Sequence, residues 1–363
     1  MALPEASAEV LVATTWHCNL ACSYCFVEDR RDGVRGRMTP RLAERLIKSL
    51  NEGLAEADEI VVHLYGGEPL TNLPAMRVMV EAAHAYPSGR FRFSITTNGT
   101  IASDEAIALL DRGQFEIVLS IDGPASVHDA CRRTAAGRPS HQRVMRFLSS
   151  VRSRTGCRIR GSAVVRSGNS LKSAVDYLKS LPLDAIKAQA VRVPGGAPFA
   201  LDDEERRAYE RDLEAIGDSV IEDLESGIQP MDDRFSGRVL QMLAGRKRER
   251  FCSAGAWVFG VTPEGVMLPC VLLDPEADAL GRLEDSPSVW VEAGKRWREE
   301  RAPRSECRVC DALPYCGGGC PAVLPVCGAD ECDLIRKNVQ VARRIYDHFE
   351  GRQTMLLGLA GMV

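Results

Sequence analysis

The hydrophobic positions of the first half of the chain alternate between two periods. Short apolar or β-branched runs recur six times, and between them apolar residues return every three or four positions. The runs predict six strands, which are Val10–Ala13, Glu59–Tyr65, Phe91–Thr97, Phe115–Ile121, Arg158–Val165 and Ala185–Val193. The stretches between them predict helices, which are Thr39–Ala57, Leu73–Tyr86, Ser103–Arg112, Ser140–Arg154 and Leu171–Leu181.

This alternation indicates a parallel sheet with right-handed crossovers and helices on its outer face. The helix that begins at Thr39 is well marked, because Thr39 can cap free backbone N–H groups and Pro40 suits the first helical position. Six strands fall short of the eight of a closed barrel. We therefore predict an α/β fold: a partial (β/α)6 parallel barrel with a small cysteine-rich C-terminal α+β domain.

The remaining pattern predicts two more helices, Asp202–Ser226 and Asp232–Arg248, and then a hairpin within Trp257–Leu273. The second of these helices ends in a basic run, which is typical of a solvated face. We divide the chain into four parts, which are a barrel at 8–195, a helical linker at 196–250, a cysteine-rich domain at 251–350 and an apolar tail at 351–363.

Composition restricts the class of protein. The chain has 363 residues, of which 45% are hydrophobic, and its 46 basic and 50 acidic residues give a net charge of -4 without a long basic stripe. We therefore expect no nucleic-acid partner. The N-terminus lacks the features of a secretory signal, and the apolar C-terminal tail is too short to cross a bilayer. These features indicate a cytoplasmic protein without a membrane partner.

Three cysteines follow the first predicted strand in a C-x₃-C-x₂-C spacing, at Cys18, Cys22 and Cys25. Three thiolates on one loop can hold three irons of a [4Fe–4S] cube and leave the fourth iron open, as an open position does at a catalytic zinc. The alternative is a zinc knuckle that also uses His17. It is disfavoured because His17 and Cys18 are adjacent and could hardly both turn onto one tetrahedral ion.

Polar motifs follow three further predicted strands, at Gly66–Pro69, Thr97–Gly99 and Ser120–Gly123. The carboxyl ends of parallel strands are where ligands bind in α/β folds. Paired glycines let a ligand approach the backbone closely. Glu68 can accept a hydrogen bond from an ammonium group, and Asp122 suits ribose hydroxyls.

Together, these motifs resemble the radical S-adenosylmethionine (SAM) superfamily, with Tyr24 before the last cysteine and with His128, Asp129 and Arg132 after the third motif. The resemblance implies that the open iron binds the amino and carboxylate groups of SAM. It also implies that the reduced cluster cleaves SAM to a 5′-deoxyadenosyl radical, which abstracts hydrogen from a substrate. The implied cofactor contacts are Tyr24, Gly66, Gly67, Glu68, Ser120, Asp122 and Arg132.

Within that set, the resemblance places Gly66, Gly67 and Glu68 at the amino group, and Ser120 and Asp122 at the ribose. Arg132 is implied as a carboxylate partner, with a solvated helix charge as the alternative.

Eight more cysteines lie in the last third, at Cys252, Cys270, Cys307, Cys310, Cys316, Cys320, Cys327 and Cys332. Zinc ribbons are one interpretation of the C-x₂-C pair. The order and spacing, however, resemble the SPASM extension of radical SAM enzymes, which carries auxiliary iron–sulfur clusters. The hairpin predicts that Cys252 and Cys270 lie near each other.

By that resemblance, a first auxiliary cluster has the ligands Cys252, Cys270 and Cys320. The second has Cys307, Cys310, Cys316 and Cys332. Cys327 is additional, and either completes the first cluster or stands apart. The sulfatase-maturing members carry one more cysteine between the positions of Cys252 and Cys270, which this chain lacks. The two cysteines outside all motifs, Cys131 and Cys157, are predicted to be buried thiols.

The leading hypothesis is a radical SAM/SPASM enzyme that modifies a peptide or protein, for example by forming a thioether or carbon–carbon cross-link. Few residues precede the first strand, so we expect leader recognition by a separate protein or by the barrel rim. An external donor such as flavodoxin or ferredoxin would supply the electron. The alternatives are a radical SAM dehydrogenase or epimerase acting on a small molecule, and a non-catalytic iron–sulfur carrier or scaffold. No catalytic acid or base can be assigned among His63, His128 and His141.

Overall fold

The computed structural model describes residues 7–25, 27 and 36–362. The chain forms two compact units, each assembled from separate stretches. Unit 1 takes the described residues of Met1–Ser120, His128–Ile159 and Ser253–Arg301, and unit 2 takes Ile121–Val127, Arg160–Cys252 and Ala302–Val363. The two units are described separately below.

Unit 1 is built on a sheet with the strand order β4-β3-β2-β1-β7-β8-β9. The strands are β1 (Ser7–Thr15), β2 (Glu59–Gly66), β3 (Phe91–Thr97), β4 (Glu116–Ser120), β7 (Val258–Val261), β8 (Val266–Leu268) and β9 (Gly281–Arg282). β1 to β4 run parallel, as predicted, and β7 adds to the free edge of β1 in parallel. The predicted hairpin is present as β7 and β8, and β9 pairs antiparallel with β8.

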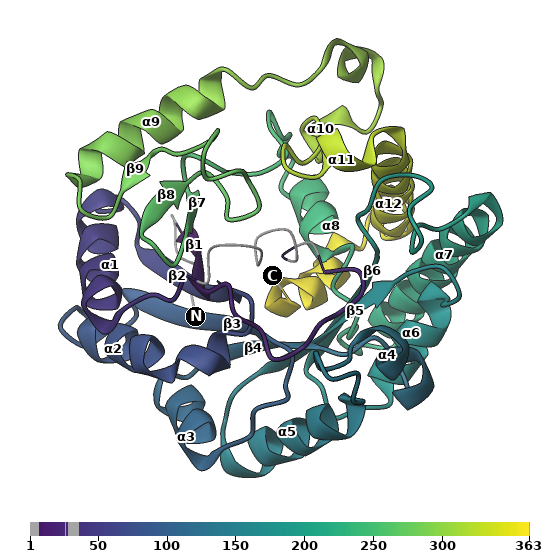
Figure 1. Cartoon of the computed structure of the whole chain (residues 1–363). Coiled ribbons are helices and arrows are strands. Elements are labelled where there is room, and N and C mark those ends of the chain that lie inside the picture. Colours follow the sequence, from purple (N-terminus) through teal and green to yellow (C-terminus); the bar gives the residue numbers. More distant parts are fainter. Residues whose placement is uncertain (1–6, 26, 28–35, 363) are drawn as a thin grey trace. The chain divides into compact units, whose positions relative to one another are not determined.

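The two faces of the parallel strands differ in burial. In β2, Ile60, Val62 and Leu64 are fully buried, whereas His63 and Tyr65, which alternate with them, are half-buried. Helices flank the strands (Figure 1), and those of unit 1 include α1 (Pro40–Gly53), α2 (Leu73–Ala83), α3 (Asp104–Arg112), α5 (His141–Arg154) and α9 (Pro287–Glu299).

The predicted start of α1 is confirmed in detail. Thr39 is the N-cap residue, and its hydroxyl accepts a hydrogen bond from the Leu42 N–H at 3.2 Å. Pro40 occupies the first turn, where it gives up no helical hydrogen bond.

Unit 2 contains the last two parallel strands, β5 (Ile159–Val165) and β6 (Ala185–Ala190), which pair with each other. Its longer helices are α6 (Leu171–Lys179), α7 (Asp203–Glu225), α8 (Ser236–Leu243) and α12 (Ala329–His348). Shorter ones are α10 (Leu313–Cys316), α11 (Leu324–Cys327) and the 3₁₀ helices η3 (Ser305–Val309) and η4 (Gln353–Met362). α4 (Ala125–Cys131) lies where the chain passes from unit 2 back to unit 1.

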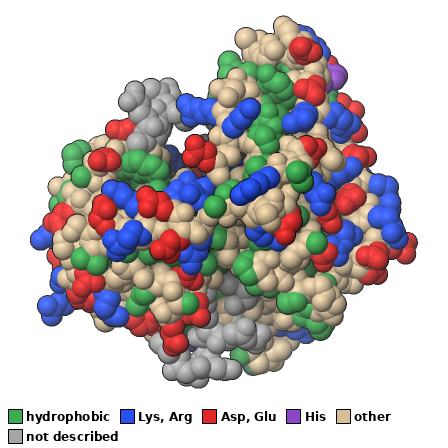
Figure 2. All heavy atoms as spheres, turned by 90° about the horizontal axis from the view of Figure 1, so that it is seen from above, with side chains coloured by type: hydrophobic (Ala, Val, Ile, Leu, Met, Phe, Trp, Pro, Cys, Tyr) green, Lys and Arg blue, Asp and Glu red, His purple; other side chains and the backbone are tan. Residues whose placement is uncertain are grey.

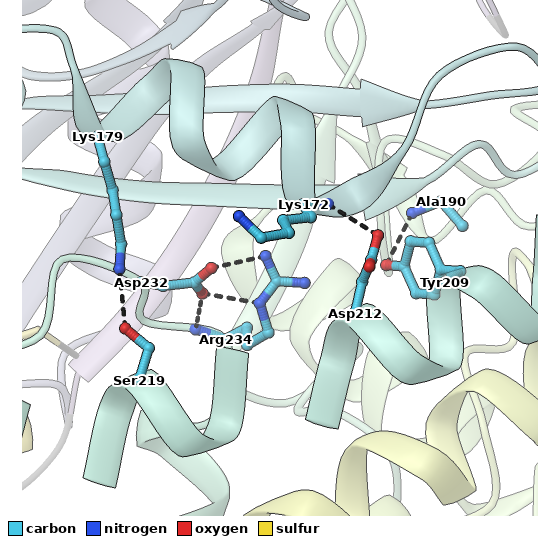
Figure 3. Close-up of polar contacts among 8 residues, drawn as sticks. All are labelled: Lys172, Lys179, Ala190, Tyr209, Asp212, Ser219, Asp232 and Arg234. Carbon is cyan, nitrogen blue, oxygen red and sulfur yellow. Dashed lines mark hydrogen bonds and ion pairs between the residues drawn. The ribbon is translucent and has the colours of Figure 1, made fainter. Parts of the chain in front are cut away.

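α7 is attached to β6 and α6 by polar contacts, shown in Figure 3. The Ala190 N–H donates to the Tyr209 hydroxyl at 3.2 Å, the Lys172 N–H donates to Asp212 at 2.9 Å, and Lys179 donates to Ser219 at 3.2 Å.

One predicted helix begins later than expected, at Ser236 rather than Asp232. The reason is long-range pairing: Asp232 forms a parallel bridge with Ile186, and the Ile186 N–H donates to the Met231 carbonyl at 2.8 Å. The carboxylate of Asp232 also binds the Arg234 guanidinium through both oxygens, at 2.8 and 2.7 Å (Figure 3). Both side chains are buried, so this pair fixes the extended segment ahead of the helix.

Charged side chains of both signs are interspersed over the face of the molecule shown in Figure 2.

Among the described residues, no helix combines the length and the hydrophobicity that crossing a membrane requires.

Gly260 in β7 provides a test of how unit 1 positions Cys270. A Cβ atom at Gly260 would lie 2.2 Å from the Val271 nitrogen and 2.6 Å from the Cys270 carbonyl carbon. We expect Gly260→Ala to lower the free energy of unfolding by about 2 kcal/mol, because backbone atoms must move to admit the methyl group. Gly156→Ala is the matched control, since nothing lies within 4 Å of its Cβ position. Chemical denaturation of both variants measures the difference; equal stabilities would contradict the packing described.

Candidate cofactor site

The cysteine loop that follows β1 is held by backbone hydrogen bonds on two sides. The Gly67 N–H donates to the Thr15 carbonyl at 2.8 Å, and the Glu68 N–H donates to the His17 carbonyl at 2.9 Å. On the other side, the Ala21 N–H donates to the Arg133 carbonyl at 2.7 Å, and the Ser23 N–H donates to the Cys131 carbonyl at 3.2 Å. The loop is therefore fixed by segments that come from distant parts of the sequence.

Cys18 accepts two N–H···S hydrogen bonds. Its Sγ atom lies 3.4 Å from the Leu20 nitrogen and 3.6 Å from Asn98 Nδ2. Asn98 also donates to Asn19 Oδ1 at 2.8 Å, and Asn19 donates to the Thr100 hydroxyl at 2.8 Å. Donors aimed at sulfur favour the thiolate form and tune a cluster bound to it.

The base of the loop is apolar. Trp16 and Val27 are buried against Ala13 and Val271, and the partly buried Cys25 packs against this cluster. Cys22 is 8% exposed. The next residue of the predicted motif, Phe26, lies outside the described residues. A cluster held here would sit on a base that excludes water, and burial is one of the properties that set cluster potentials.

The two glycines of the Gly-Gly-Glu-Pro motif allow the loop and β2 to meet. Gly66 has φ +111°, a conformation that side chains rarely adopt. A Cβ atom at Gly67 would lie 2.2 Å from the His17 carbonyl oxygen. Glycine at position 67 is therefore required for the loop to approach this closely.

Glu68 is buried, with 1% of its surface exposed, and receives three hydrogen bonds. Its Oε1 accepts from the Leu70 N–H at 3.1 Å and the Thr97 hydroxyl at 2.7 Å, and its Oε2 accepts from the Asn98 N–H at 2.7 Å. Burial raises the pKa of Glu68 to about 7, and the three donors act in the opposite direction. The carboxyl group thus ties the end of β2 to the end of β3.

The other predicted contacts, Tyr24, Arg132, Ser120 and Asp122, come from both units. The Arg132 guanidinium lies over the Tyr24 ring, 5.5 Å from its centroid, so the structure brings these two residues together. Ser120 is half-buried at the end of β4. Asp122 belongs to unit 2, where its buried carboxylate accepts from the Val164 N–H at 3.0 Å.

His128 and Asp129 have structural contacts that position Arg132. The fully buried His128 ring bonds the Ser140 hydroxyl at 3.0 Å, and that hydroxyl donates to the Arg132 carbonyl at 2.5 Å. The Asp129 carboxylate accepts from the Ser140 and His141 N–H groups at 2.8 and 2.9 Å, at the start of α5. Together they fix the segment that pairs with the cysteine loop.

His63, another of the three histidines considered from the sequence, is half-buried on β2. Its Nε2 lies 2.8 Å from the Thr96 hydroxyl, and its Nδ1 lies 3.4 Å from the Glu9 carboxylate.

The cysteines of the last third are divided between the units. Cys270 belongs to unit 1, and the other seven belong to unit 2, so the predicted proximity of Cys252 and Cys270 stays a prediction.

Cys131 and Cys157 are 5% and 6% exposed, which confirms that they are buried thiols. In the described parts of the chain, no three His, Cys, Asp or Glu side chains gather closely enough for one metal ion. An iron–sulfur cube is instead held by thiolates on separate irons.

The model of the radical SAM superfamily matches residues 12–164, which contain the three loop cysteines and the three polar motifs that follow β2, β3 and β4. Residues 12–164 form a radical SAM domain.

Two curated relatives extend this result. The cysteine-type anaerobic sulfatase-maturating enzyme of Clostridium perfringens (strain 13 / Type A) is 24% identical over 324 residues, covering 84% of this chain and 85% of that protein. The serine-type anaerobic sulfatase-maturating enzyme of Bacteroides thetaiotaomicron is 28% identical over 159 residues, or 42% of this chain and 38% of that protein. In that second match, the chain spans less than half the length of its relative.

Two solved structures share the fold. Native anSMEcpe with bound AdoMet superimposes with a TM-score of 0.80 at 20% identity, covering 94% of this chain and 99% of that chain. Streptococcus suis SuiB bound to precursor peptide SuiA gives a TM-score of 0.61 at 17% identity, covering 90% and 74%. The first match confirms the predicted fold class of this chain.

The sequence did not single out the side chains that support the cysteine loop. The sequence places Asn98 in a polar motif at the end of a strand but predicts no contact with the cysteine loop, and it gives Asn19 no role. A polar residue directly after the first cysteine of the motif was the available signal, but its partners lie about eighty residues away.

Glu68 gives a testable pH dependence. Because the pKa is raised in the folded state from 4.5 to about 7, the stabilisation from the neutral carboxyl is complete below pH 4.5 and is lost as the pH rises through 7. Between about pH 5 and pH 7.5, we expect wild type to lose about 2 kcal/mol of unfolding free energy relative to Glu68→Gln.

Urea unfolding of the SAM-free protein at both pH values measures this loss. Glu276→Gln, which changes an exposed carboxylate, should keep the wild-type pH dependence. Parallel curves for wild type and Glu68→Gln would contradict the raised pKa.

Proposed function

We propose that this protein is a radical SAM maturase that modifies a side chain of a peptide or protein. The observation that carries the proposal is the cysteine loop, whose backbone is bonded to Gly67 and to the buried Glu68 within a radical SAM domain. The match to sulfatase-maturating enzymes along most of the chain supports a substrate of the peptide class.

The donor set fits a cluster with one open iron. Cys18, Cys22 and Cys25 would supply three thiolates, and the N–H groups of Leu20 and Asn98 already point at the first of them. When bound and reduced, this group supplies the electron that cleaves SAM and releases the 5′-deoxyadenosyl radical, which takes a hydrogen atom from the substrate. The apolar residues at the base of the loop would exclude water from one side of such a cluster.

The chain's own residues would orient SAM around this cluster. Gly66, Gly67 and Glu68 would bind its amino group, and an ammonium ion beside Glu68 would favour the ionised carboxylate. Ser120 and Asp122 would contact the ribose. Arg132, stacked on Tyr24, would bind the carboxylate, and the hydrogen bonds of His128 and Asp129 hold its backbone in place.

The cysteine-rich C-terminus would hold auxiliary clusters, with Cys252, Cys270 and Cys320 on the first and Cys307, Cys310, Cys316 and Cys332 on the second. Cys327 would be a further ligand of the first auxiliary cluster, beside Cys320. The segment between them is wound like a helix, because the Leu324 N–H donates to the Cys320 carbonyl and the Cys327 N–H donates to the Val323 carbonyl, both at 2.9 Å. Residues seven apart on such a winding share one face.

Two of the similar solved structures contain a bound peptide: anSMEcpe with the Kp18Cys peptide, and SuiB with the precursor peptide SuiA. We propose the same class for this chain, with an external flavodoxin- or ferredoxin-type donor and with leader recognition by the chain or by a separate protein. The missing cysteine between Cys252 and Cys270 separates it from the sulfatase-maturing pattern, and favours another modification, such as a cross-link.

Anaerobic reconstitution tests the radical chemistry. After loading with iron and sulfide, wild type with dithionite and SAM should form 5′-deoxyadenosine, measured by chromatography. Cys18→Ala/Cys22→Ala/Cys25→Ala should fall to the detection limit because it lacks the ligands of the open cluster. Cys131→Ala/Cys157→Ala, which removes two buried thiols outside the motifs, should retain the activity. No deoxyadenosine from fully loaded wild type would favour an electron carrier or scaffold.

The substrate class has a separate test. Fluorescence anisotropy should detect binding of a candidate precursor peptide, and binding of its isolated leader would assign recognition to this chain. If neither binds, either to the protein alone or with a candidate recognition protein, the result favours a small-molecule dehydrogenase or epimerase.

A further inference from the structure

Unit 2 contains a cavity of about 310 Å³ at the place where β5 ends, between the start of α6 and the first turns of α7. None of the residues assigned above to SAM or to a cluster lines this cavity. The carboxyl ends of parallel strands are where ligands bind in α/β folds. A cavity of this size is at the lower end of the range for small-ligand sites, and suits one side chain of a larger ligand.

Part of the cavity lining is apolar. Val165 ends β5, Leu171 begins α6 and Tyr209 belongs to α7, and all three side chains are buried. Leu201, just before α7, lies in the same lining. The Tyr209 hydroxyl is already occupied, because it accepts from the Ala190 N–H at 3.2 Å. This part of the cavity therefore favours the hydrocarbon portion of a ligand.

The lining also contains two carboxylates from α7, Glu205 and Asp212. They are seven residues apart and so share one face of the helix. The Gly168 N–H and the Ser167 hydroxyl donate to Glu205 at 2.7 and 3.0 Å, and the Lys172 N–H donates to Asp212 at 2.9 Å (Figure 3). Partial burial acts to raise the pKa of Glu205, but its hydrogen bonds outweigh this effect and lower the pKa. Glu205 is therefore ionised at neutral pH.

These two carboxylates lack a cationic partner within the chain. In the part of the chain that the structure describes, neither forms an ion pair with a lysine, arginine or histidine. The neighbouring cations are used elsewhere: the ammonium group of Lys172 pairs with Asp176, and Arg206 pairs with Asp330 at 2.6 Å. Two negative charges without a partner at an apolar cavity attract a cation that also carries hydrocarbon.

Asn169, another lining residue, has an unsatisfied donor. Its Nδ2 atom is buried and has no hydrogen-bond partner among the described residues. A buried donor without an acceptor costs free energy, which an acceptor brought by a ligand would recover. A peptide carbonyl oxygen is such an acceptor. The loop that carries Asn169 is fixed, because the Ser167 N–H donates to the Phe199 carbonyl at 3.1 Å, so the cavity is formed before a ligand arrives.

We propose that this cavity binds a lysine or arginine side chain of the peptide or protein substrate. The hydrocarbon portion of that side chain packs against Val165, Leu171 and Tyr209, and its cationic end pairs with Glu205 and Asp212. The inference rests on the proposed function, which gives this chain a peptide or protein substrate. It adds a preference for a basic residue in that substrate.

Saturation-transfer nuclear magnetic resonance on the iron-loaded full chain tests the proposal with N-acetyl-L-lysine methylamide as the probe. N-acetyl-L-norleucine methylamide is the control probe, because it keeps the four-carbon chain and lacks the ammonium group. Asp212→Asn removes one charge and keeps an oxygen that can accept from the Lys172 N–H. Ala208→Phe fills the cavity, which Ala208 lines. Glu222→Gln is the control variant, because it removes an exposed carboxylate of α7 that lies outside the lining.

We expect the lysine probe to bind wild type in the millimolar range, and the norleucine probe to bind more weakly. Asp212→Asn should weaken binding of the lysine probe about fivefold, the upper end of the effect of a solvent-accessible ion pair. Ala208→Phe should abolish this binding, and Glu222→Gln should match wild type.

Equal binding of the two probes would overturn the proposal, because the carboxylates would then play no part. Absence of binding of the lysine probe would overturn it as well, as would binding that a folded Ala208→Phe variant leaves unchanged. If Ala208→Phe does not fold, the two probes compared on wild type and Asp212→Asn still decide.

Probe binding is measured without SAM, so its result is separate from that of the proposed function. Wild type that forms 5′-deoxyadenosine but does not bind the lysine probe contradicts this inference alone. Iron-loaded wild type that forms no deoxyadenosine contradicts the proposed function.

Discussion

The site depends on one constraint: the cysteine loop after β1 must be held rigidly enough for three sulfurs to face one cluster. A loop is mobile unless its backbone groups are bonded, and here the rim of the parallel sheet supplies the partners. The Gly67 and Glu68 N–H groups bind one side of the loop, and the segment after α4 binds the other. The buried Glu68 carboxyl joins the rim itself, from the end of β2 to the end of β3.

In this arrangement the polar motifs can both bind a cofactor and support the protein's own structure. Glu68 was predicted from the sequence to accept from an ammonium group, and the structure shows that it already accepts three hydrogen bonds from the protein. A pKa of about 7 makes its charge sensitive to a cation placed beside it. His128 and Asp129 act one step further away, by holding the segment that carries Arg132.

Most of the fold could be predicted because its elements are local patterns. A few adjacent residues determine both the alternating burial of β2 and the start of α1 at Thr39–Pro40. Sequence patterns did not predict the features that depend on contacts between distant residues. Asp232 pairs with Ile186 instead of beginning a helix, and α9 went unpredicted because few of its residues, chiefly Trp290 and Trp297, are apolar and buried. The contact between Arg304 and Cys332 likewise has no local signal.

The central claim is that the cysteine loop holds a cluster whose open iron receives SAM. The most direct measurement is the electron paramagnetic resonance (EPR) spectrum of the reduced, iron-loaded protein before and after SAM is added. The account predicts that SAM changes one signal, and that this signal is the one missing from Cys18→Ala/Cys22→Ala/Cys25→Ala. A loaded protein whose signals are all unchanged by SAM would contradict it.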